Sequence, residues 1–477
     1  MRSLRWVVLF CFSIALGGPL SAGRAGRAGR ATPGEKGRPN VLVIMTDDQR
    51  VDQMRVLPKT LALLGARGTT FDNSFVDVSL CCPSRSTFLT GQYAHNHGVL
   101  ANGGPHGGYI HLDNSNTLAV WLQEAGYYTA HVGKYLNNYG ADSPAVPPGW
   151  SRWFGLIDPS TYRMYGYTVS DGGKPVGYME SPRDYQTDVL AAKAEEILRS
   201  RAGSDQPFFL TVAPTVPHLE RLGHRQTPPR PAPRYRGRFA REMLPVAASF
   251  NEGDVSDKPA HIRRLPPFTP ERRALTTEIY RAELASLLAV DDLVERLVKT
   301  LEATGQLDRT VILFTSDNGF FLGEHRIPEG KYLPYEESIR VPLIIRGGGF
   351  PSGAHVAQMV SNVDLAPTIV ALTDVKARRV MDGRPLLPLA FDPRQGKDRT
   401  LLIEGYGQGK GKPPFTAVRD PRWFYAEYKN GDRELYDLQR DPAELRSLHA
   451  DPAAAAVLQD LARRLARLRT CSGSSCL

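Results

Sequence analysis

The chain has 477 residues, of which 42% are hydrophobic and 23% charged, a composition that excludes a disordered, collagen-like or coiled-coil protein. Its length suits one large α/β domain with a smaller companion better than a single small module. The formal net charge of +9 is compatible with acidic polymers as partners. Five cysteines in a chain of this length exclude a disulfide scaffold.

Residues 1–22 have the pattern of a secretory signal peptide. Arg2 and Arg5 precede an apolar run over 6–16, and small residues follow. The run is shorter than the roughly 20 residues that span a bilayer, so we expect a secreted or otherwise exported protein without a stable membrane span. Residues 23–38, with their Ala-Gly-Arg triplets, are expected to form a flexible stalk.

Strands and helices alternate along residues 39–375, which we expect to form the larger domain. Short apolar runs predict buried strands, at 40–45, 127–132, 208–213, 311–315 and 341–345. Helical patterns follow between them, at 86–91, 118–125, 185–200 and 276–304. This alternation predicts an α/β fold with a large, mostly parallel sheet that is covered by helices on both faces.

The character of the chain changes over residues 376–477. Short strands are expected, at 399–404, 416–418, 423–429 and 434–438. An amphipathic helix is expected over 453–468. We therefore expect a smaller C-terminal α+β subdomain with an antiparallel sheet. Cys471 and Cys476 near its end could close a small disulfide in an oxidising compartment or remain free thiols.

Polar side chains follow several of the expected strands. Two strands run straight into the pairs Asp47-Asp48 and Asp317-Asn318, and two others lead to Lys134 and His218. In an open α/β sheet, ligands bind outside the carboxyl ends of the strands, so these side chains should meet. Three carboxylates and an amide oxygen predict a site for Ca²⁺ or Mg²⁺. A turn or helix cap is the alternative for one Asp-Asp pair, but the second pair follows its strand in the same way.

The most specific signal is the run Cys81-Cys82-Pro83-Ser84-Arg85, with Thr90-Gly91 downstream. A buried cysteine before a helix-starting proline is the structural alternative. The run matches the Cys-x-Pro-x-Arg signature, and the chain resembles the type I sulfatases, whose fold is alkaline-phosphatase-like. Only Cys81 fits the register, because Cys82 would need a proline at position 84. Further matching blocks cover nearly the whole chain: PNVLVIMTDDQ, GKYLN, PH at 217–218, TSDNG and GKYLPYEESIRVPLIIRG.

This resemblance implies a catalytic domain at 39–375 with a defined set of cofactors and residues. In the family, a formylglycine-generating enzyme oxidises the signature cysteine to formylglycine (3-oxoalanine), the catalytic aldehyde, and one Ca²⁺ ion is bound beside it. The implied metal ligands are Asp47, Asp48, Cys81 as formylglycine, Asp317 and Asn318. The implied catalytic residues are Cys81 as the nucleophile, Arg85, Lys134, His218 and Lys331.

One departure from the family pattern bears on the substrate. Leu136 stands where many members have histidine, which leaves the general acid open. The variant GKYLN and the run at 95–97 resemble the branch that includes N-acetylglucosamine-6-sulfatases and extracellular heparan 6-O-endosulfatases. The resemblance implies hydrolysis of 6-O-sulfate esters of N-acetylglucosamine or glucosamine units in sulfated glycans, with His97 and Asn137 as substrate contacts. The alternatives are a phosphate or phosphonate ester hydrolase of the same superfamily and a non-catalytic, calcium-dependent binder of sulfated glycans.

A basic segment follows His218. Residues 221–241 contain seven arginines and no acidic residue, interleaved with prolines. The segment is either a solvated surface loop or a rim that attracts a sulfated polymer through long-range electrostatic steering, and the sequence leaves both open. A sulfated carbohydrate is the expected partner, and no nucleic acid is expected.

Overall fold

The computed structural model describes residues 37–392, 394–408 and 412–477. The expected signal peptide and the expected stalk up to residue 36 lie outside the described residues. Residues 38–477 belong to one unit that contains two main sheets. The boundary expected between residues 375 and 376 falls between these sheets in the chain and stays a prediction.

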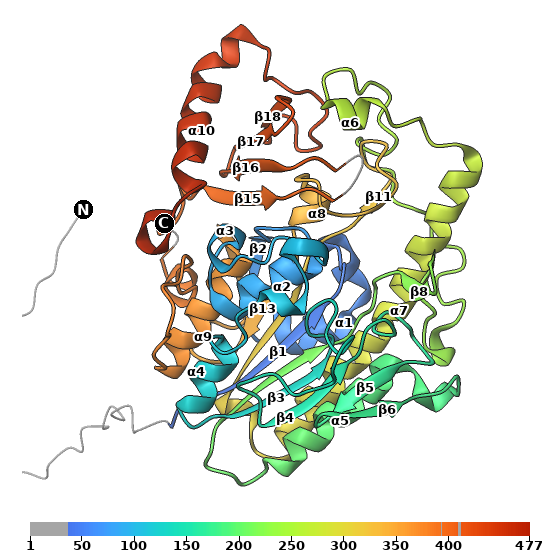
Figure 1. Cartoon of the computed structure of the whole chain (residues 1–477), viewed down its shortest axis with the longest axis vertical. Coiled ribbons are helices and arrows are strands. Elements are labelled where there is room, and N and C mark those ends of the chain that lie inside the picture. Colours follow the sequence, from blue (N-terminus) through green and yellow to red (C-terminus); the bar gives the residue numbers. More distant parts are fainter. Residues whose placement is uncertain (1–36, 393, 409–411) are drawn as a thin grey trace, which may run out of the picture. The chain divides into compact units, whose positions relative to one another are not determined.

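Among the described residues, ten strands form the large sheet, in the order β14-β2-β13-β10-β1-β7-β3-β4-β5-β6 (Figure 1). They are β1 Asn40–Thr46, β2 Thr69–Phe75, β3 Tyr128–Gly133, β4 Arg152–Leu156, β5 Thr168–Asp171, β6 Lys174–Gly177, β7 Phe208–Ala213, β10 Thr310–Ser316, β13 Leu343–Arg346 and β14 Ala354–Ser361. The central strands β10, β1, β7, β3 and β4 are parallel. The mostly parallel sheet is confirmed, but β13 is antiparallel to both of its neighbours and β5 and β6 form an antiparallel margin.

The side chains of β1 show why the sheet lies between two layers of helices. Leu42 and Ile44 pack in one apolar cluster with α5 (Gln186–Ser200) and α7 (Pro270–Ala303). The alternate residues of β1 pack in a second cluster with α2 (Cys81–Thr90), α4 (Leu118–Glu124) and α9 (Leu365–Thr373). Every residue of β1 is buried, as expected for a strand covered on both faces.

Two helices begin earlier than the sequence pattern predicted. α7 begins at Pro270 because Thr269 caps it, with its side chain accepting a hydrogen bond from the Arg272 amide. α2 begins at Cys81, five residues before the expected start, and ends at Gly91, whose φ of 68° suits a helix C-cap. All residues of α2 are buried, so no amphipathic pattern could reveal its first turns.

A four-stranded antiparallel sheet forms the C-terminal part, as expected. Its strands follow one another in space as in sequence: β15 Leu401–Gly405, β16 Phe415–Arg419, β17 Trp423–Tyr428 and β18 Arg433–Asp437. α10 (Ala455–Leu468) packs against one face through Leu461, Leu465 and Leu468 (Figure 1). Cys471 and Cys476, just after α10, form a disulfide.

Short elements connect these layers. They are α1 Pro58–Thr60, α3 Ala94–His97, α6 Ala260–Arg263, α8 Glu336–Ile339, β8 Glu220–Leu222, β9 Arg225–Thr227, β11 Phe321–Leu322 and β12 Glu329–Gly330. Within the described residues, we find no helix with the length and apolar character that a bilayer span requires.

Candidate active site

The carboxyl ends of the central strands carry the acidic side chains to one place. Asp47 and Asp48 follow β1, and Asp317 and Asn318 follow its parallel neighbour β10. The Asp317 Oδ1 atom accepts a hydrogen bond from the Asp48 amide at 3.2 Å. The N-terminus of α2 places Cys81 beside these residues. The structure therefore brings together all the side chains that we expected to hold a cation.

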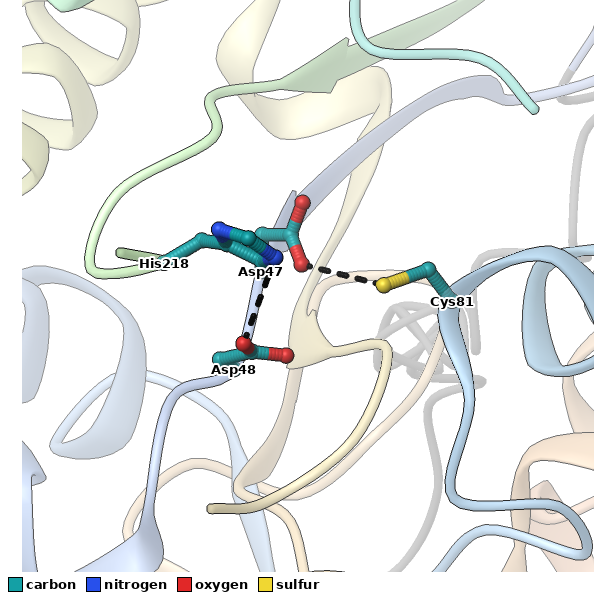
Figure 2. Close-up of side chains that lie close together, drawn as sticks. All are labelled: Asp47, Asp48, Cys81 and His218. Carbon is teal, nitrogen blue, oxygen red and sulfur yellow. Dashed lines mark hydrogen bonds and ion pairs between the residues drawn. The ribbon is translucent and has the colours of Figure 1, made fainter. Parts of the chain in front are cut away.

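The centre of the site is formed by Asp47, Asp48, Cys81 and His218 (Figure 2). Each places one polar atom within 4.8 Å of the others, and all four side chains are buried. Cys81 Sγ donates to Asp47 Oδ1 at 3.4 Å, and His218 Nε2 lies 3.6 Å from Asp48 Oδ2. His218 Nδ1 lies 2.6 Å from the Leu219 carbonyl oxygen, which can only accept, so this nitrogen carries a proton and Nε2 faces the acidic side chains.

Three basic side chains surround the carboxylates. Arg85 Nε donates to Asp317 Oδ2 at 2.8 Å, and its NH1 donates to the Lys134 carbonyl at 2.9 Å. Lys134 pairs with Asp47, and Lys331 pairs with Asp48. Lys331 Nζ also lies 2.8 Å from Cys81 Sγ. The site thus matches three carboxylates with three buried cationic groups, of which Lys331 contacts the cysteine.

These charges set the protonation of the site. Burial tends to raise the pKa of the Asp47 carboxyl, but Lys134 and the other cations outweigh this effect and hold the pKa well below its usual range. Burial raises the pKa of the Cys81 thiol to about 11, and Asp47 adds to this effect. An unmodified Cys81 is therefore a neutral thiol and a weak nucleophile.

The neighbouring Cys82 lies outside this group. Its backbone amide donates to Asn102 Oδ1 at 2.8 Å, and its side chain is fully buried in an apolar cluster that includes Phe88. The geometry therefore agrees with the register of the sequence signature, in which Cys81 and not Cys82 is the reactive position.

The two expected substrate contacts lie in different surroundings. Asn137 is close to the site, and its side-chain oxygen is buried without a hydrogen-bond partner among the described residues. His97 points elsewhere: its Nε2 lies 3.1 Å from Thr87 Oγ1, and its Nδ1 accepts from the Val99 amide at 3.1 Å. Because both ring nitrogens of His97 are used within the protein, the geometry does not support its expected substrate role.

Tyr162 is a site residue that sequence reasoning missed. Its ring stacks on His218 with 4.1 Å between centroids, and Lys134 Nζ lies 4.7 Å from the ring centroid. Its hydroxyl accepts from Asn137 Nδ2 at 2.7 Å. Tyr162 lies in the loop between β4 and β5, where no motif marks it, and only the fold places it against three predicted site residues.

We expect Tyr162→Leu to lower kcat by about 10- to 100-fold, because His218 and Lys134 lose the surface that orients them. Tyr162→Phe keeps the ring and should stay within about threefold of the wild type. Steady-state kinetics and thermal unfolding of both variants test whether the Tyr162 ring orients His218 and Lys134. A parallel loss of kcat and Tm in both variants would show that Tyr162 acts only on stability.

His95 and Asn96 contact the C-terminal tail. His95 Nδ1 lies 2.9 Å from Glu404 Oε1, and its Nε2 lies 2.8 Å from the Cys471 carbonyl oxygen. Asn96 Nδ2 donates to the same carbonyl at 2.8 Å. These contacts attach α3 to the segment that the Cys471–Cys476 disulfide closes, so the run at 95–97 has a structural role in this fold.

The His95 contact predicts a pH dependence of stability. Burial opposes the charge on His95, but Glu404 outweighs it and raises the pKa of His95 to about 9. The free energy of unfolding should therefore include a contribution that is full below the unfolded-state pKa and lost as the pH rises to about 9. Partial exposure of the ring limits it to about 1–2 kcal/mol. Urea unfolding of the wild type and His95→Gln at pH 6 and 9.5 measures this contribution. If the variant showed the same pH dependence as the wild type, the role of His95 would be contradicted.

The seven arginines of the basic segment at 221–241 fall into three groups. Arg230 pairs with Glu220 and Glu180, and Arg234 pairs with Asp188 and Asp292, so these two hold the segment onto the fold. Arg221 lies with its guanidinium carbon 4.7 Å from the centroid of the Tyr162 ring. The remaining arginines of the segment are exposed: Arg225, Arg236, Arg238 and Arg241.

The family is established by sequence comparison. Residues 39–375 match the sulfatase family, and residues 323–471 match the family described as N-sulphoglucosamine sulphohydrolase, C-terminal. The chain belongs to the sulfatase family and is a sulfatase, a hydrolase of sulfuric esters.

Several named relatives are similar over most of the chain. The N-acetylglucosamine-6-sulfatase of Homo sapiens is 33% identical over 92% of this chain and 86% of its own length. The arylsulfatase of Volvox carteri is 35% identical over 92% of this chain and 76% of its own length. The extracellular sulfatase Sulf-1 homologue of Drosophila melanogaster is 36% identical over 78% of this chain but only 33% of its own length.

Solved structures share the fold. One protein, solved in complex with its substrate D-glucosamine-2-N,6-O-disulfate, superposes with a TM-score of 0.78 at 24% identity, over 91% of this chain and 97% of its own. The phosphonate monoester hydrolase of Agrobacterium radiobacter superposes with a TM-score of 0.71 at 24% identity, over 91% of this chain and 95% of its own. The alkaline-phosphatase-like sulfatase fold expected from the sequence is confirmed.

Proposed function

We propose that this sulfatase is exported and removes the 6-O-sulfate ester from N-acetylglucosamine or glucosamine units of sulfated glycans. The observation that carries the proposal is the buried group of Asp47, Cys81 and Lys331, whose contacts of 3.4 and 2.8 Å centre on the cysteine. The human relative named N-acetylglucosamine-6-sulfatase supports the substrate class, as does the glucosamine disulfate bound to a protein of the same fold.

The residues around Cys81 fit a hard dication. Three carboxylates and the amide of Asn318 supply only oxygen ligands, the set that Ca²⁺ prefers. Asn318 Oδ1 is buried and has no hydrogen-bond partner among the described residues, as a ligand atom should be. We propose that one Ca²⁺ ion is held by Asp47, Asp48, Asp317, Asn318 and the modified residue 81. When bound, Ca²⁺ supplies a positive charge that stabilises an anionic oxygen next to it.

Cys81 is the proposed position of formylglycine, made by a formylglycine-generating enzyme during maturation. Its hydrated aldehyde supplies two hydroxyl groups on one carbon, which the neutral thiol of Cys81 cannot offer. Lys331 Nζ, 2.8 Å from Sγ, is placed to neutralise charge at this position. The location of Cys81 at the N-terminus of the ten-residue helix α2 also favours an anionic group there.

The basic side chains have complementary roles in the proposal. Arg85 is held by Asp317 and the Lys134 carbonyl, so it fixes the two strand ends relative to α2. Lys134 and Lys331 bind the oxygens of the sulfate ester, whose charge they balance in a buried site. His218 presents Nε2 to the same space and, with Lys331, assists the departure of the sugar alcohol. Asn137 Oδ1 is free to accept from a sugar hydroxyl.

Export is supported by two features. The first 22 residues have the pattern of a signal peptide, and Cys471 and Cys476 form a disulfide, which is typical of oxidising compartments. Detection of the protein outside the cytoplasm of its producer, with a mature N-terminus near residue 23, tests this point. An active protein that still carries residues 1–22 would contradict the proposed cleavage.

A comparison of small substrates tests the proposed specificity. We expect N-acetylglucosamine 6-sulfate and glucosamine 2-N,6-O-disulfate to be hydrolysed with a higher kcat/KM than p-nitrophenyl sulfate, and the disulfate to lose its 6-sulfate and keep its N-sulfate. Equal efficiency on the aryl sulfate and the sugars would contradict the sugar assignment, and would favour the activity named for the Volvox carteri relative. Phenyl phosphonate esters belong in the same assay, because a phosphonate monoester hydrolase shares the fold.

The exposed arginines of the basic segment are the proposed rim for a polymer. Replacing Arg225, Arg236 and Arg238 with glutamine should raise KM for a long sulfated chain by about three- to tenfold at low salt, because steering acts on encounter. KM for N-acetylglucosamine 6-sulfate should stay unchanged. The matched control replaces three exposed arginines of the C-terminal part, Arg440, Arg463 and Arg467. Equal effects of both triple variants would show that only net charge matters.

A further inference from the structure

A second group of ligand-type side chains lies outside the site described above. It consists of His325, between β11 and β12, Glu337 on α8, and Glu444, which follows β18. Each contributes one ligand atom, and these atoms all lie within 4.8 Å of one another. His325 is fully buried and Glu444 is 1% exposed. Three segments of the chain therefore bring one imidazole and two carboxylates to a single interior point.

One side-chain atom of each of these residues has no hydrogen-bond partner in the part of the chain that the structure describes. His325 Nε2, Glu337 Oε2 and Glu444 Oε1 are buried without a hydrogen bond among the described residues. Their companion atoms are occupied: Glu337 Oε1 accepts from Ser249 Oγ at 3.2 Å, and Glu444 Oε2 accepts from the Glu336 amide at 3.1 Å. Unpaired buried polar atoms are costly, so one on each of the three clustered residues points to a missing common partner.

The orientation of His325 is that of a metal ligand. Its Nδ1 lies 2.7 Å from Glu252 Oε2, and its ring stacks on Tyr335 with 4.2 Å between centroids. When the Nδ1–H group of a neutral His325 donates a hydrogen bond to the Glu252 carboxylate, Nε2 keeps its lone pair and can bind a metal. A carboxylate that fixes the far nitrogen in this way is the usual support of a metal-bound histidine.

The neighbouring carboxylates have partners of their own. Glu434 accepts hydrogen bonds from the hydroxyl groups of Tyr335, Tyr428 and Tyr436. Glu252 pairs with Lys258, Glu324 with Arg50 and Glu336 with Arg419. Within the described ranges, neither the Glu337 nor the Glu444 carboxylate has a basic side chain within 4.0 Å. Lys258 is directed to the backbone carbonyls of Glu444 and Leu445. The buried Glu444 and the half-buried Glu337 thus remain without a basic partner, and one divalent cation would supply the counter-charge.

We propose that His325, Glu337 and Glu444 bind a structural Zn²⁺ ion. The mixed imidazole and carboxylate set suits Zn²⁺ better than Ca²⁺, which prefers oxygen ligands alone. Neighbouring ligands of a tetrahedral ion with bonds of about 2.1 Å are about 3.4 Å apart, so side-chain movements of about 1 Å close the site. This inference does not depend on the proposed substrate or on the proposed Ca²⁺ ion.

The ion would join Glu444 of the C-terminal part to the segment that follows Asn318. The Glu337 and Ser338 carbonyls of α8 accept from the amides of Phe320 and Gly319, which directly follow Asn318. The same region packs in one apolar cluster with the strands of the C-terminal sheet, near β11 and α8 in Figure 1. Zn²⁺ at this point would therefore stabilise the segment that leads from Asn318 to Lys331.

Metal analysis of the full-length protein tests the proposal. After chelation and exposure to Zn²⁺ alone, followed by buffer exchange, the wild type and Asp317→Asn should each retain roughly one zinc per chain. His325→Gln and Glu444→Gln should lose it. His261→Gln is the matched control, since within the described ranges both ring nitrogens of His261 also lack partners but lie outside the cluster. Zinc should raise the Tm of the wild type and control but not of the two ligand variants.

A measurement on the wild type avoids the risk that a variant fails to fold. Crystals grown with zinc should show an anomalous peak at the zinc edge between His325 Nε2, Glu337 Oε2 and Glu444 Oε1. The absence of a peak there, or equal zinc retention by the wild type and His325→Gln, would overturn the proposal. Binding of Ca²⁺ at this point in preference to Zn²⁺ would overturn the assignment of the ion.

Discussion

Replacing Cys81 with serine is expected to lower kcat by about 10⁴-fold or more, with little change in Tm. An unoxidised serine has one hydroxyl group instead of the two of a hydrated aldehyde, so the proposed nucleophile is lost while the size of the side chain is kept. Sulfate release from N-acetylglucosamine 6-sulfate, followed by ion chromatography, measures the effect. Thermal unfolding of the same preparation shows whether the variant is folded.

The neighbouring cysteine provides the matched control. Cys82→Ala removes a sulfur atom from the adjacent position, where the side chain is fully buried among apolar residues. It should cost about 1 kcal/mol of stability and leave kcat within about threefold of the wild type. A Cys81→Ser variant with a tenth or more of the wild-type activity, or a Cys82→Ala variant as impaired as Cys81→Ser, would contradict the assignment of Cys81.

Asp317→Asn is expected to remove the proposed Ca²⁺ ion and to lower kcat by about 10³-fold. The substitution keeps the shape of the side chain, but it removes one of three negative charges and leaves the buried Arg85 without its 2.8 Å ion pair. Metal content by mass spectrometry and steady-state kinetics test both effects. Chelation of the wild type should abolish activity, and Ca²⁺ should restore it better than Zn²⁺.

A second buried aspartate distinguishes loss of the ion from loss of an ion pair. Asp437 is 4% exposed and pairs with Arg422 at 2.6 Å in the C-terminal sheet. Asp437→Asn should lower stability and retain both calcium and kcat. Full activity of the wild type after complete removal of metal would show that the acidic cluster has no part in the reaction.

The sequence predicted the acidic half of the site because strand patterns carry local information. A buried run that ends in Asp47-Asp48, and another that ends in Asp317-Asn318, are visible without tertiary contacts, and parallel pairing of β1 with β10 brings them together. Cys81, Arg85 and Lys331 were predicted from the family motifs alone, because hydrophobic periodicity does not indicate single catalytic residues. The sequence pattern predicted α2 to start too late. All residues of its first turns are buried, so they show no alternation of apolar and polar faces.

Other features depend on packing between distant segments. Tyr162 meets His218 across 56 positions of the chain, and no property of its own loop indicates this contact. Arg230 and Arg234 are paired with acidic side chains from other segments, which the sequence of the basic segment alone does not indicate. His325, Glu337 and Glu444 come from three segments, and Glu444 lies in the C-terminal part, so their convergence is a property of the tertiary fold.

The most direct test of the proposed chemistry is mass spectrometry of the tryptic peptide 68–85 from protein purified from its native producer. This peptide contains Cys81 and Cys82 and no other cysteine. We predict an aldehyde, or its hydrate, in place of the thiol at position 81 and an unmodified cysteine at position 82. An unmodified Cys81 in protein that hydrolyses N-acetylglucosamine 6-sulfate would contradict the account.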